Sequence, residues 1–396
     1  MNEPRLRFKD DNGNKLPDWK ENKIGELGTF TKGAPLSKAD ISDCGEPLIL
    51  YGELYTTYNE VAYNIQRRTQ ATIDEKYYSH VGDVIIPTSG ETAEEISTAT
   101  CVMVPNVALG GDLNIYRSKH VDGRIISYVL NHQAKWKIAK LAQGKSVVHI
   151  QAAQLANITV KYPPSHVEQQ KIASLFTELD TLIQSAEKEL EGYRELKQGM
   201  LQKMFPKKGE KVPEIRFPEF TGDWKQRKVS EMFKITRGYV LPVTETSEET
   251  NSEMPYPVYS SQTKNNGLMG YYSNYLYEDA ITWTTDGANA GTVNYRAGKF
   301  YCTNVCGVLL SDKIEASKAI AEALNNVAKK HVSYVGNPKL MNNVMAEIQI
   351  AVPPTKEEQD KISSYFELLD NLITLQQREL DGYKELKKGL LQQMFC

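Results

Sequence analysis

The chain contains one segment twice, and this duplication limits the folds it can adopt more than any other feature of the sequence. The segments 163–205 and 353–395 align without a gap at an offset of 190 (353 − 163), and 24 of the 43 aligned positions are identical. A weaker echo precedes each copy, because Trp19-Lys20 and Trp224-Lys225 match at an offset of 205 (224 − 19). The echo also includes Thr31-Lys32-Gly33 with Thr236-Arg237-Gly238, and the lead-ins Pro4-Arg5-Leu6-Arg7-Phe8 and Pro213-Glu214-Ile215-Arg216-Phe217. Two copies of one frame therefore hold two inserts, residues 33–162 and 238–352, that do not align with each other.

Each repeated segment is predicted to form one long helix. Apolar residues recur at steps of three and four over about five heptads, which is typical of a coiled-coil seam. Both copies open with two prolines followed by an N-cap residue, Ser165 or Thr355. Glu168 and Glu358 follow three positions later, so we expect a capping box at both starts. About 40 residues make a helix of roughly 60 Å.

Each seam needs a partner, and two arrangements supply one. A coiled coil between two chains is the first. Pairing within one chain is favoured, because the near-identical second copy is always present at a high effective concentration. Antiparallel pairing leaves room for an insert at each end. The predicted fold is therefore α+β, with two mixed α/β domains joined by two long helices that form an intramolecular antiparallel coiled coil with a pseudo-twofold repeat.

The Pro- and Gly-containing stretch after Phe205 is the clearest boundary in the chain. It divides the sequence into domain 1 (1–162), a first helix (163–205), a linker (206–212), domain 2 (213–352) and a second helix (353–396). Apolar runs predict strands at residues 83–87, 280–283 and 306–310, and one helix in each domain, at 125–141 and 316–330.

Composition describes a globular protein of 396 residues, with 40% apolar and 24% charged residues. The net charge of −3 does not indicate a nucleic-acid binder, so a DNA-binding face would have to be a local patch. The five cysteines lack the paired spacing of zinc sites and indicate a reduced, cytoplasmic protein. We expect no membrane span and no secretory signal, since no long apolar run is present.

Catalytic signatures are mostly absent from the sequence. Gly144-Lys145-Ser146 resembles the end of a phosphate-binding loop, but Ala139 stands where that motif needs its first glycine. We therefore predict that the chain catalyses nothing by itself.

The inserts carry polar loops suited to hydrogen bonding with bases. Gln and Asn pair with adenine, Glu accepts from cytosine, and Lys or Arg reaches guanine or phosphate. Ordinary turn composition explains any single loop, but several loops on each of two duplicated units favour a DNA-binding role. Lys32 and Arg237 are assigned to phosphate. The candidate DNA-binding residues are Lys32, Tyr55, Thr56, Thr57, Tyr58, Thr88, Ser89, Gly90, Glu91, Thr92, Arg237, Ser260, Ser261, Gln262, Lys264, Asn265, Asn266, Asp286, Gly287, Ala288, Asn289 and Ala290.

The layout resembles the specificity subunit of a type I restriction-modification system. The two PPxxxEQxKI…LD.LI…EL.GY.ELK.G.LQ.MF helices, the W-K-x3-[I/V]-x-E entries ending in T-[K/R]-G, and residues 286–292 (DGANAGT) carry the resemblance, which covers essentially the whole chain. It implies that each domain is a target recognition domain reading one half of a split double-stranded DNA site. It implies that the helices dock two modification subunits, which use S-adenosylmethionine, and that restriction subunits using ATP and Mg join this core. This chain is then expected to hold no cofactor and no metal.

Matching charged residues on the two helices extend this reading to the partner surface. A buried seam constrains only apolar positions, yet exposed-looking polar positions also match. The candidate partner-binding residues are Glu189, Glu195, Lys197, Gln202, Glu379, Glu385, Lys387 and Gln392.

Two other classes of protein stay open at this point. A non-catalytic two-site binder of a glycan or other ligand fits the 22 tyrosines and polar loops. An enzyme with an unrecognised site is the third reading. Salt separates the first two, because DNA affinity falls steeply with ionic strength whereas neutral glycan binding barely responds.

Overall fold

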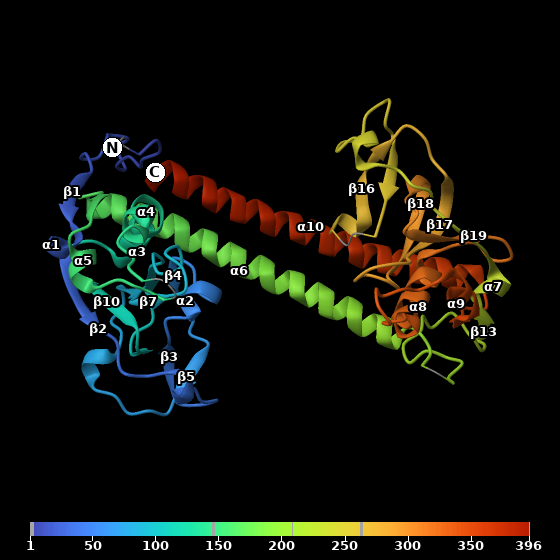
Figure 1. The fold of residues 1–396 in the computed structure, drawn as a ribbon, viewed down its shortest axis with the longest axis horizontal. Helices are drawn as coiled ribbons and strands as arrows, with labels where there is room; N and C mark the ends of the chain where they lie inside the picture. Colours follow the sequence, from blue (N-terminus) through green and yellow to red (C-terminus); the bar gives the residue numbers. More distant parts are fainter. Residues whose placement is uncertain (1–3, 145–146, 208, 262–263, 396) are drawn as a thin grey trace. The chain divides into compact units, whose positions relative to one another are not determined.

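The computed structural model describes residues 4–144, 147–207, 209–261 and 264–395, and it divides into two compact units (Figure 1). Unit 1 comprises Met1–Ser185 and Leu380–Cys396, and unit 2 comprises Ala186–Glu379. Each unit thus combines one domain with the start of the helix that follows it and the end of the other long helix. Each long helix therefore contributes to both units.

The core of unit 1 is a sheet in the order β2-β10-β6-β8-β4 within the described residues. Its central strand β6 (Asp83–Pro87) coincides with the predicted run and is buried along its whole length. The predicted helix is present as three consecutive pieces, α3 (Gly123–Tyr128), a π-helical turn (Val129–Gln133) and α4 (Lys135–Ala139). The other elements are β1 (Lys20–Lys23), α1 (Ile24–Leu27), β2 (Gly28–Lys32), β3 (Glu46–Ile49), α2 (Glu53–Thr56), β4 (Val61–Ala62), β5 (Arg67–Thr69), β7 (Ser89–Gly90), β8 (Thr100–Val102), β9 (Ala108–Leu109), β10 (Leu113–Ser118), β11 (Val148–His149), α5 (Ala152–Ala156) and β12 (Thr159–Tyr162).

The core of unit 2 is a sheet in the order β14-β19-β17-β18-β15-β16 within the described residues. The predicted strands lie inside β17 (Tyr277–Thr284) and β19 (Cys306–Ser311), and the predicted helix is α8 (Lys318–Ala328), which is capped by Ser317. The other elements are β13 (Lys225–Lys228), α7 (Val229–Met232), β14 (Phe233–Arg237), β15 (Tyr256–Tyr259), β16 (Leu268–Tyr272), β18 (Val293–Cys302), α9 (Asn342–Glu347) and β20 (Gln349–Val352).

The weak sequence echo corresponds to a real structural repeat at the entry to each domain. β1 pairs with β12 antiparallel, starting with Lys20 opposite Tyr162. β13 pairs with β20 in the same way, starting with Lys225 opposite Val352. The entry strands keep the offset of the tryptophan motif and the closing strands keep that of the long helices, so the frame closes behind each insert just before the long helix begins.

The long helices α6 (His166–Lys203) and α10 (Lys356–Phe395) lie antiparallel within each unit. In unit 1, Phe395 at the end of α10 packs on Phe176 near the start of α6, with ring centroids 6.4 Å apart. In unit 2, Phe205 just after α6 packs on Phe366 near the start of α10, with centroids 5.9 Å apart. Both end residues are buried in the core of the domain that they reach. The predicted antiparallel pairing within one chain is confirmed.

The capping boxes at the two helix starts are only half formed. The backbone N–H of Glu168 donates to Ser165 Oγ (3.5 Å), and that of Glu358 donates to Thr355 Oγ1 (3.2 Å). The two carboxylates, however, are fully buried and bind the domain instead: Glu168 accepts from Arg7 at 3.0 and 2.9 Å, and Glu358 accepts from Arg216 at 2.7 and 2.8 Å. The arginine of each repeated lead-in therefore anchors the long helix that follows its domain. Trp19 and Trp224 donate to the same two carboxylates, at 3.3 and 3.2 Å.

No helix in the described part of the chain is both long and apolar enough to cross a membrane. Cys302 and Cys306 are buried thiols, and burial raises the pKa of Cys306 to about 11. In residues 4–395, outside the gaps named above, no group of three His, Cys, Asp or Glu side chains is placed to hold a metal ion.

Candidate DNA-recognition loops and helix clamps

In domain 1 the structure brings two of the predicted loops together at the end of strand β6. Tyr55, on α2, donates from its hydroxyl to the carbonyl of Ser89 at 2.9 Å. Burial raises the pKa of Tyr55, so the hydroxyl stays protonated as a donor. Thr56, Glu91 and Thr92 are exposed around this contact. The arrangement presents short polar side chains on a fixed backbone.

Domain 2 joins its two loops in a comparable way at the end of strand β17. Asn289 donates from Nδ2 to the carbonyl of Ser261 at 3.3 Å, so the 285–292 loop contacts the 259–267 loop. Ser260 accepts from Thr303 Oγ1 at 3.0 Å. Asn265 and Asn266 are exposed and adopt left-handed backbone conformations, with φ of 50° and 53°.

A buried arginine that the sequence did not single out positions this asparagine turn. Arg296 Nη2 donates to the carbonyl of Asn266 at 2.7 Å, and its Nε donates to Thr282 Oγ1 at 3.1 Å. The guanidinium carbon lies 3.7 Å from the ring centroid of Tyr259. Burial lowers the pKa of Arg296. These groups surround a cavity of about 60 Å³, which is lined by Ser260, Asn266, Thr282, Trp283, Thr284, Thr292, Asn294, Arg296 and Cys306.

The two residues assigned to phosphate occupy matching positions at the ends of matching strands. Lys32 is the last residue of β2 and Arg237 the last residue of β14, and both are exposed. The glycine that follows each one is required by packing. A Cβ on Gly33 would overlap the carbonyl of Gly110, and one on Gly238 would overlap that of Cys302. In the repeated T-[K/R]-G motif, an exposed cation is therefore followed by a glycine, because the backbone there lies too close to a neighbouring carbonyl for any side chain.

Several candidate residues are not available as side-chain contacts. Tyr58 and Ala290 are buried in hydrophobic clusters, and Ser89 and Gly90 form the buried strand β7, which pairs with β11. We leave these four out of the proposed DNA-contacting set. Of the rest, Thr57, Thr88, Asp286 and Gly287 are partly exposed and Ala288 is exposed, whereas Gln262 and the side chain of Lys264 lie outside the described residues.

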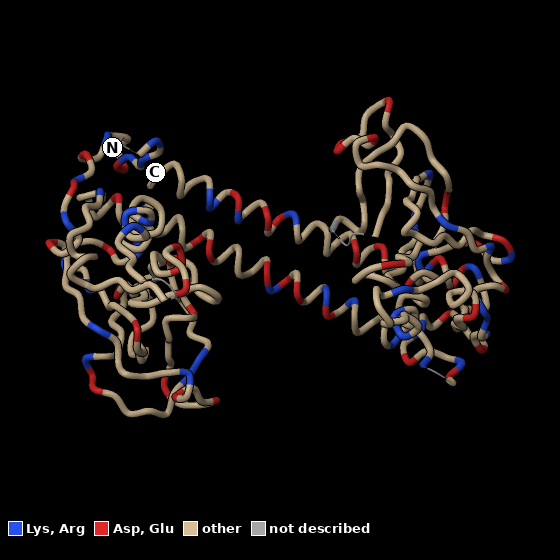
Figure 2. Tube along the Cα trace, viewed as in Figure 1, with Lys and Arg blue, Asp and Glu red and all other residues tan. Residues whose placement is uncertain are grey.

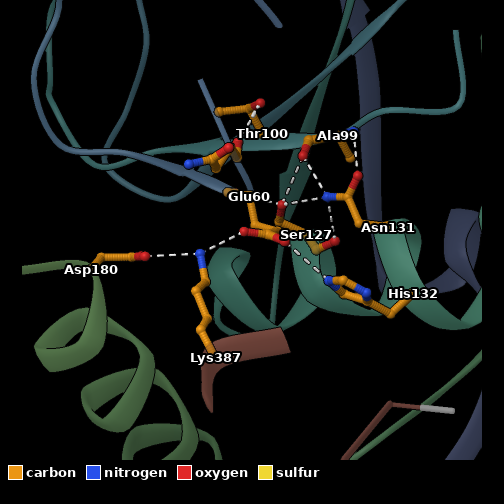
Figure 3. Close-up of polar contacts among 9 residues, drawn as sticks. Glu60, Ala99, Thr100, Ser127, Asn131, His132, Asp180 and Lys387 are labelled. Atoms are coloured by element: carbon orange, nitrogen blue, oxygen red, sulfur yellow. Dashed lines mark hydrogen bonds and ion pairs between the residues drawn. The ribbon is translucent and has the colours of Figure 1, made fainter. Parts of the chain in front are cut away.

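Lys387 was predicted to lie on an exposed partner surface, but it is buried where the end of α10 packs inside unit 1. Its Nζ donates to Glu60 at 2.7 Å and to Asp180 on α6 at 2.8 Å (Figure 3). Burial alone would raise the pKa of Glu60, but a hydrogen bond with His132 (3.1 Å) and the charge of Lys387 lower it to about 2. Burial raises the pKa of Asp180, while Glu60 and Asp180 together raise that of Lys387 against its burial. Ser127 fixes the backbone of Glu60 by donating to its carbonyl at 2.6 Å.

Lys197 forms the equivalent contact in unit 2 and is likewise largely buried. It binds Asp370 on α10 at 2.6 Å and Glu322 on α8 at 3.1 Å. Lys318 binds the same two carboxylates at 2.5 and 3.1 Å. Burial opposes the charge of Asp370, but the two lysines lower its pKa. The matching of Lys197 with Lys387 is therefore explained by internal ion pairs, which we call clamp 2 and clamp 1 respectively.

The other six predicted partner-binding residues are exposed on the helices. They are Glu189, Glu195, Gln202, Glu379, Glu385 and Gln392. Lys and Arg are interspersed with Asp and Glu along both helices (Figure 2). Leu196 and Leu386 are 44% and 50% exposed at matching positions beside Glu195 and Glu385.

Comparison with known proteins identifies the family. The family model for the type I restriction modification DNA specificity domain matches the chain twice, at residues 17–192 and 221–382. A putative type I specificity subunit of Mycoplasma pneumoniae is 32% identical over 251 residues, which is 59% of this chain and 93% of that protein. The specificity subunit of the MjaVIII type I restriction enzyme of Methanocaldococcus jannaschii is 22% identical over 97% of this chain and 94% of its own length.

Solved structures show the same fold. The S subunit of a type I restriction-modification system from M. genitalium superposes with a TM-score of 0.72 at 18% identity, covering 100% of this chain and 99% of that one. A chain from a study of complex assembly and conformational transition of the type I system gives a TM-score of 0.52 at 16% identity, covering 96% and 98%. The two family matches, which together span most of the chain, show that it belongs to the type I restriction-modification specificity subunits, the non-catalytic DNA-recognition part of these enzymes.

Proposed function

We propose that domain 1 and domain 2 each read one half of a split DNA site while the long helices hold two modification subunits. The observation that carries the proposal is a shared frame with unlike loops. Both domains join two polar loops at the end of a core strand, through Tyr55 in one case and Asn289 in the other. A common scaffold with different side chains at its edge is the arrangement that two different half-sites require.

Exposed cations support binding to the DNA backbone. Lys32 and Arg237 take the same place in the two domains, and a phosphate contact at both would orient each domain in the same manner. Base pairs between the half-sites then stay unread, because each domain carries its own pair of loops. Neutral glycans offer no counterpart for these cations.

The helix surface supports docking of one partner at two places. Leu196 and Leu386 are exposed on matching turns, next to the matched glutamates. Gly199 and Gly389 follow three positions later, and Gly192 and Gly382 precede them. Among the described residues, a Cβ at any of the four would meet no atom outside its own helix backbone. Glycine in a helix costs roughly 1 kcal/mol relative to alanine, so four such positions need another reason. Close approach of a partner backbone supplies one.

Methylation mapping of host DNA by the assembled complex tests the split site. Glu91→Ala in domain 1 should relax one half of the methylated sequence, and Asn289→Ala in domain 2 should relax the other half. Glu75→Ala, which changes an exposed glutamate outside the predicted loops, serves as the matched control. A variant in one domain that changes both halves, or a methylated site that is not split, would contradict the proposal.

Native mass spectrometry of the co-expressed proteins tests the assembly. We expect one chain with two modification subunits, restriction subunits joining this core, and S-adenosylmethionine, ATP and Mg used by those partners. The isolated chain should transfer no methyl group. A complex that stays one-to-one with the partner in excess would sink the docking proposal.

A further inference from the structure

A pair of reciprocal backbone hydrogen bonds is repeated in the two domains although the sequence that it encloses is not. Gln143 and His149 bond to each other through their backbones at 3.2 and 2.9 Å, and Ser333 and Lys339 do so at 2.8 and 2.9 Å. The two pairs are separated by the same offset as the long helices (333 − 143 and 339 − 149 both equal 190). We call residues 333–339 hairpin 2. The common frame thus reaches further into the inserts than the sequence indicates.

Hairpin 2 is joined to the predicted recognition loop of domain 2. The N–H of Gly287 donates to the carbonyl of Pro338 at 2.9 Å, and that of Leu340 donates to the carbonyl of Thr285 at 2.8 Å. Lys339 lies 3.6 Å from the carboxylate of Asp286. In domain 1 the corresponding bond runs from Ile150 to Thr88 at 3.0 Å. Hairpin 2 therefore lies at the edge where the 285–292 loop lies.

Hairpin 2 presents a large apolar pair to solvent. Tyr334 is 71% exposed and Val335 92% exposed, whereas the flanking residues Val332 and Leu340 are buried and anchor the hairpin. Gly336, with φ of 76°, makes the turn. The hairpin backbone is tied to the loop while its two largest apolar side chains contribute nothing to the core.

The segment that carries this apolar pair is basic, although Lys339 is paired with Asp286 of the neighbouring loop. Residues 329–339 include Lys329, Lys330, His331 and Lys339 and no acidic residue, in a chain whose net charge is −3. Lys329 and Lys330 are exposed at the end of α8. Protein–protein interfaces are depleted in lysine, whereas protein surfaces that bind DNA use lysine to neutralise phosphates. An exposed valine also suits the methyl group of thymine, and a flat tyrosine ring suits a base or sugar.

We propose that hairpin 2 is a third DNA-contacting element of domain 2, with Tyr334 and Val335 on the bases or sugars and Lys329 and Lys330 on phosphate. This inference rests on the proposed role of domain 2 in reading a half-site. It adds a specificity element that is not among the loops predicted from sequence. Duplex DNA is the occupant, and a protein partner is the outcome that would overturn it.

Binding of the assembled complex to fluorescent duplexes tests the inference, once methylation mapping has given the site. One duplex carries the mapped site, and a second carries a scrambled half-site for domain 2. Tyr334→Ala and Val335→Ser should each weaken binding to the mapped site by roughly 5- to 100-fold and binding to the scrambled duplex much less. The double variant Lys329→Ala/Lys330→Ala should weaken both duplexes alike and flatten the dependence of affinity on salt.

Val81→Ser is the matched control, because Val81 is also an exposed valine but precedes strand β6, at the end away from the domain 1 loop. Thermal unfolding should not change for any of these exposed positions. If the wild-type complex binds the scrambled duplex as tightly as the mapped site, the proposed role of domain 2 in reading a half-site is wrong. If the wild type discriminates and Tyr334→Ala and Val335→Ser behave like it, hairpin 2 is not a DNA contact. Loss of modification subunits from Tyr334→Ala with DNA binding intact would assign the hairpin to a protein interface and also overturn the inference.

Discussion

Clamp 1 and clamp 2 use the same helix residues and different domain residues. In both, a lysine near the end of one long helix binds an aspartate near the start of the other: Lys387 with Asp180, and Lys197 with Asp370. The third member is Glu60, from a loop, in clamp 1 and Glu322, from α8, in clamp 2. The helix pair is thus constant, and each unrelated insert supplies its own carboxylate to meet it.

The clamps also differ in how well their charges balance. Clamp 2 has two lysines for two carboxylates, because Lys318 joins Lys197. Clamp 1 has Lys387 for two carboxylates, with His132 beside Glu60. Clamp 2 therefore contains a second cation able to keep both carboxylates paired, and clamp 1 depends on one lysine.

The largest expected effect comes from removing that lysine. Lys387→Ala leaves two largely buried carboxylates without their lysine, and we expect a loss of roughly 3–5 kcal/mol in the free energy of unfolding. Lys197→Ala should cost only about 1–2 kcal/mol, since Lys318 still holds both partners. Denaturant midpoints measure both. Lys388→Ala, at the adjacent exposed lysine, should stay within about 0.5 kcal/mol of the wild type. Equal losses for Lys387→Ala and Lys197→Ala would show that the second lysine gives no support.

Acid should weaken clamp 1 in a way that one substitution can isolate. The folded-state pKa of Glu60 is lowered from 4.5 to about 2, so its ionised form stabilises the fold above pH 4.5. That contribution, roughly 3 kcal/mol, is lost as the pH falls from 4.5 towards 2. Asp180, whose pKa is raised, acts in the opposite direction and makes the fall shallower. Unfolding of Glu60→Gln measured against pH should lack this component, and a variant that follows the wild-type curve would assign the acid sensitivity elsewhere.

The two arginines that anchor the long helices should contribute equally to the free energy of unfolding, in contrast to the lysines of the two clamps. Arg7→Ala and Arg216→Ala each remove a paired arginine from a fully buried glutamate, and each should cost roughly 2 kcal/mol because the tryptophan N–H still donates. Arg5→Ala, at an exposed arginine two positions earlier, is the control. Unfolding free energies that differ widely between the two anchor variants would mean that the frame is less symmetric than its contacts.

The smallest effect on stability should accompany a large effect on assembly. Gly199→Ala and Gly389→Ala should stabilise the isolated chain by about 0.5–1 kcal/mol, because helical alanine is favoured and no atom opposes the new methyl group. Phenylalanine at the same positions should lower affinity for the modification subunit in titrations. Unchanged affinity for Gly→Phe at both positions would remove this face from the proposed interface.

The shared frame could be predicted because the sequence repeats it. The ion pairs of the two clamps could not be predicted. The constant offset between the two long helices marks Lys197 and Lys387 as equivalent, but it does not reveal that Glu322 and Glu60 lie opposite them. Those carboxylates come from inserts that share no alignment, so their approach depends on the fold of each domain. Exposure of a matched lysine on a helix could not be inferred from its match alone.

Hairpin 2 was not predicted from the sequence for a related reason. The sequences enclosed by the two backbone pairs differ, while the apolar residues that follow keep the offset of the long helices: Ile150 with Leu340, Leu155 with Met345, and Ile158 with Ile348. All six are buried. An alignment continued upstream from the paired prolines, scored by apolar pattern instead of identity, would have extended the frame to this hairpin. Backbone hydrogen bonds hold its shape, and they place little demand on side chains.

The burial of Phe395 in unit 1 has a consequence for synthesis. The slot between Trp19, Tyr128 and Phe176 is filled by the end of α10, and Phe395 is made one full repeat after Phe205. At the usual rate of chain elongation, a nascent chain carries this slot open for about 10–40 s after Phe205 has been added. Phe205 of the same chain is joined to Phe176 almost entirely through the continuous helix α6, which keeps it from folding back. This part of unit 1 is therefore completed only when the last residues of α10 have been made.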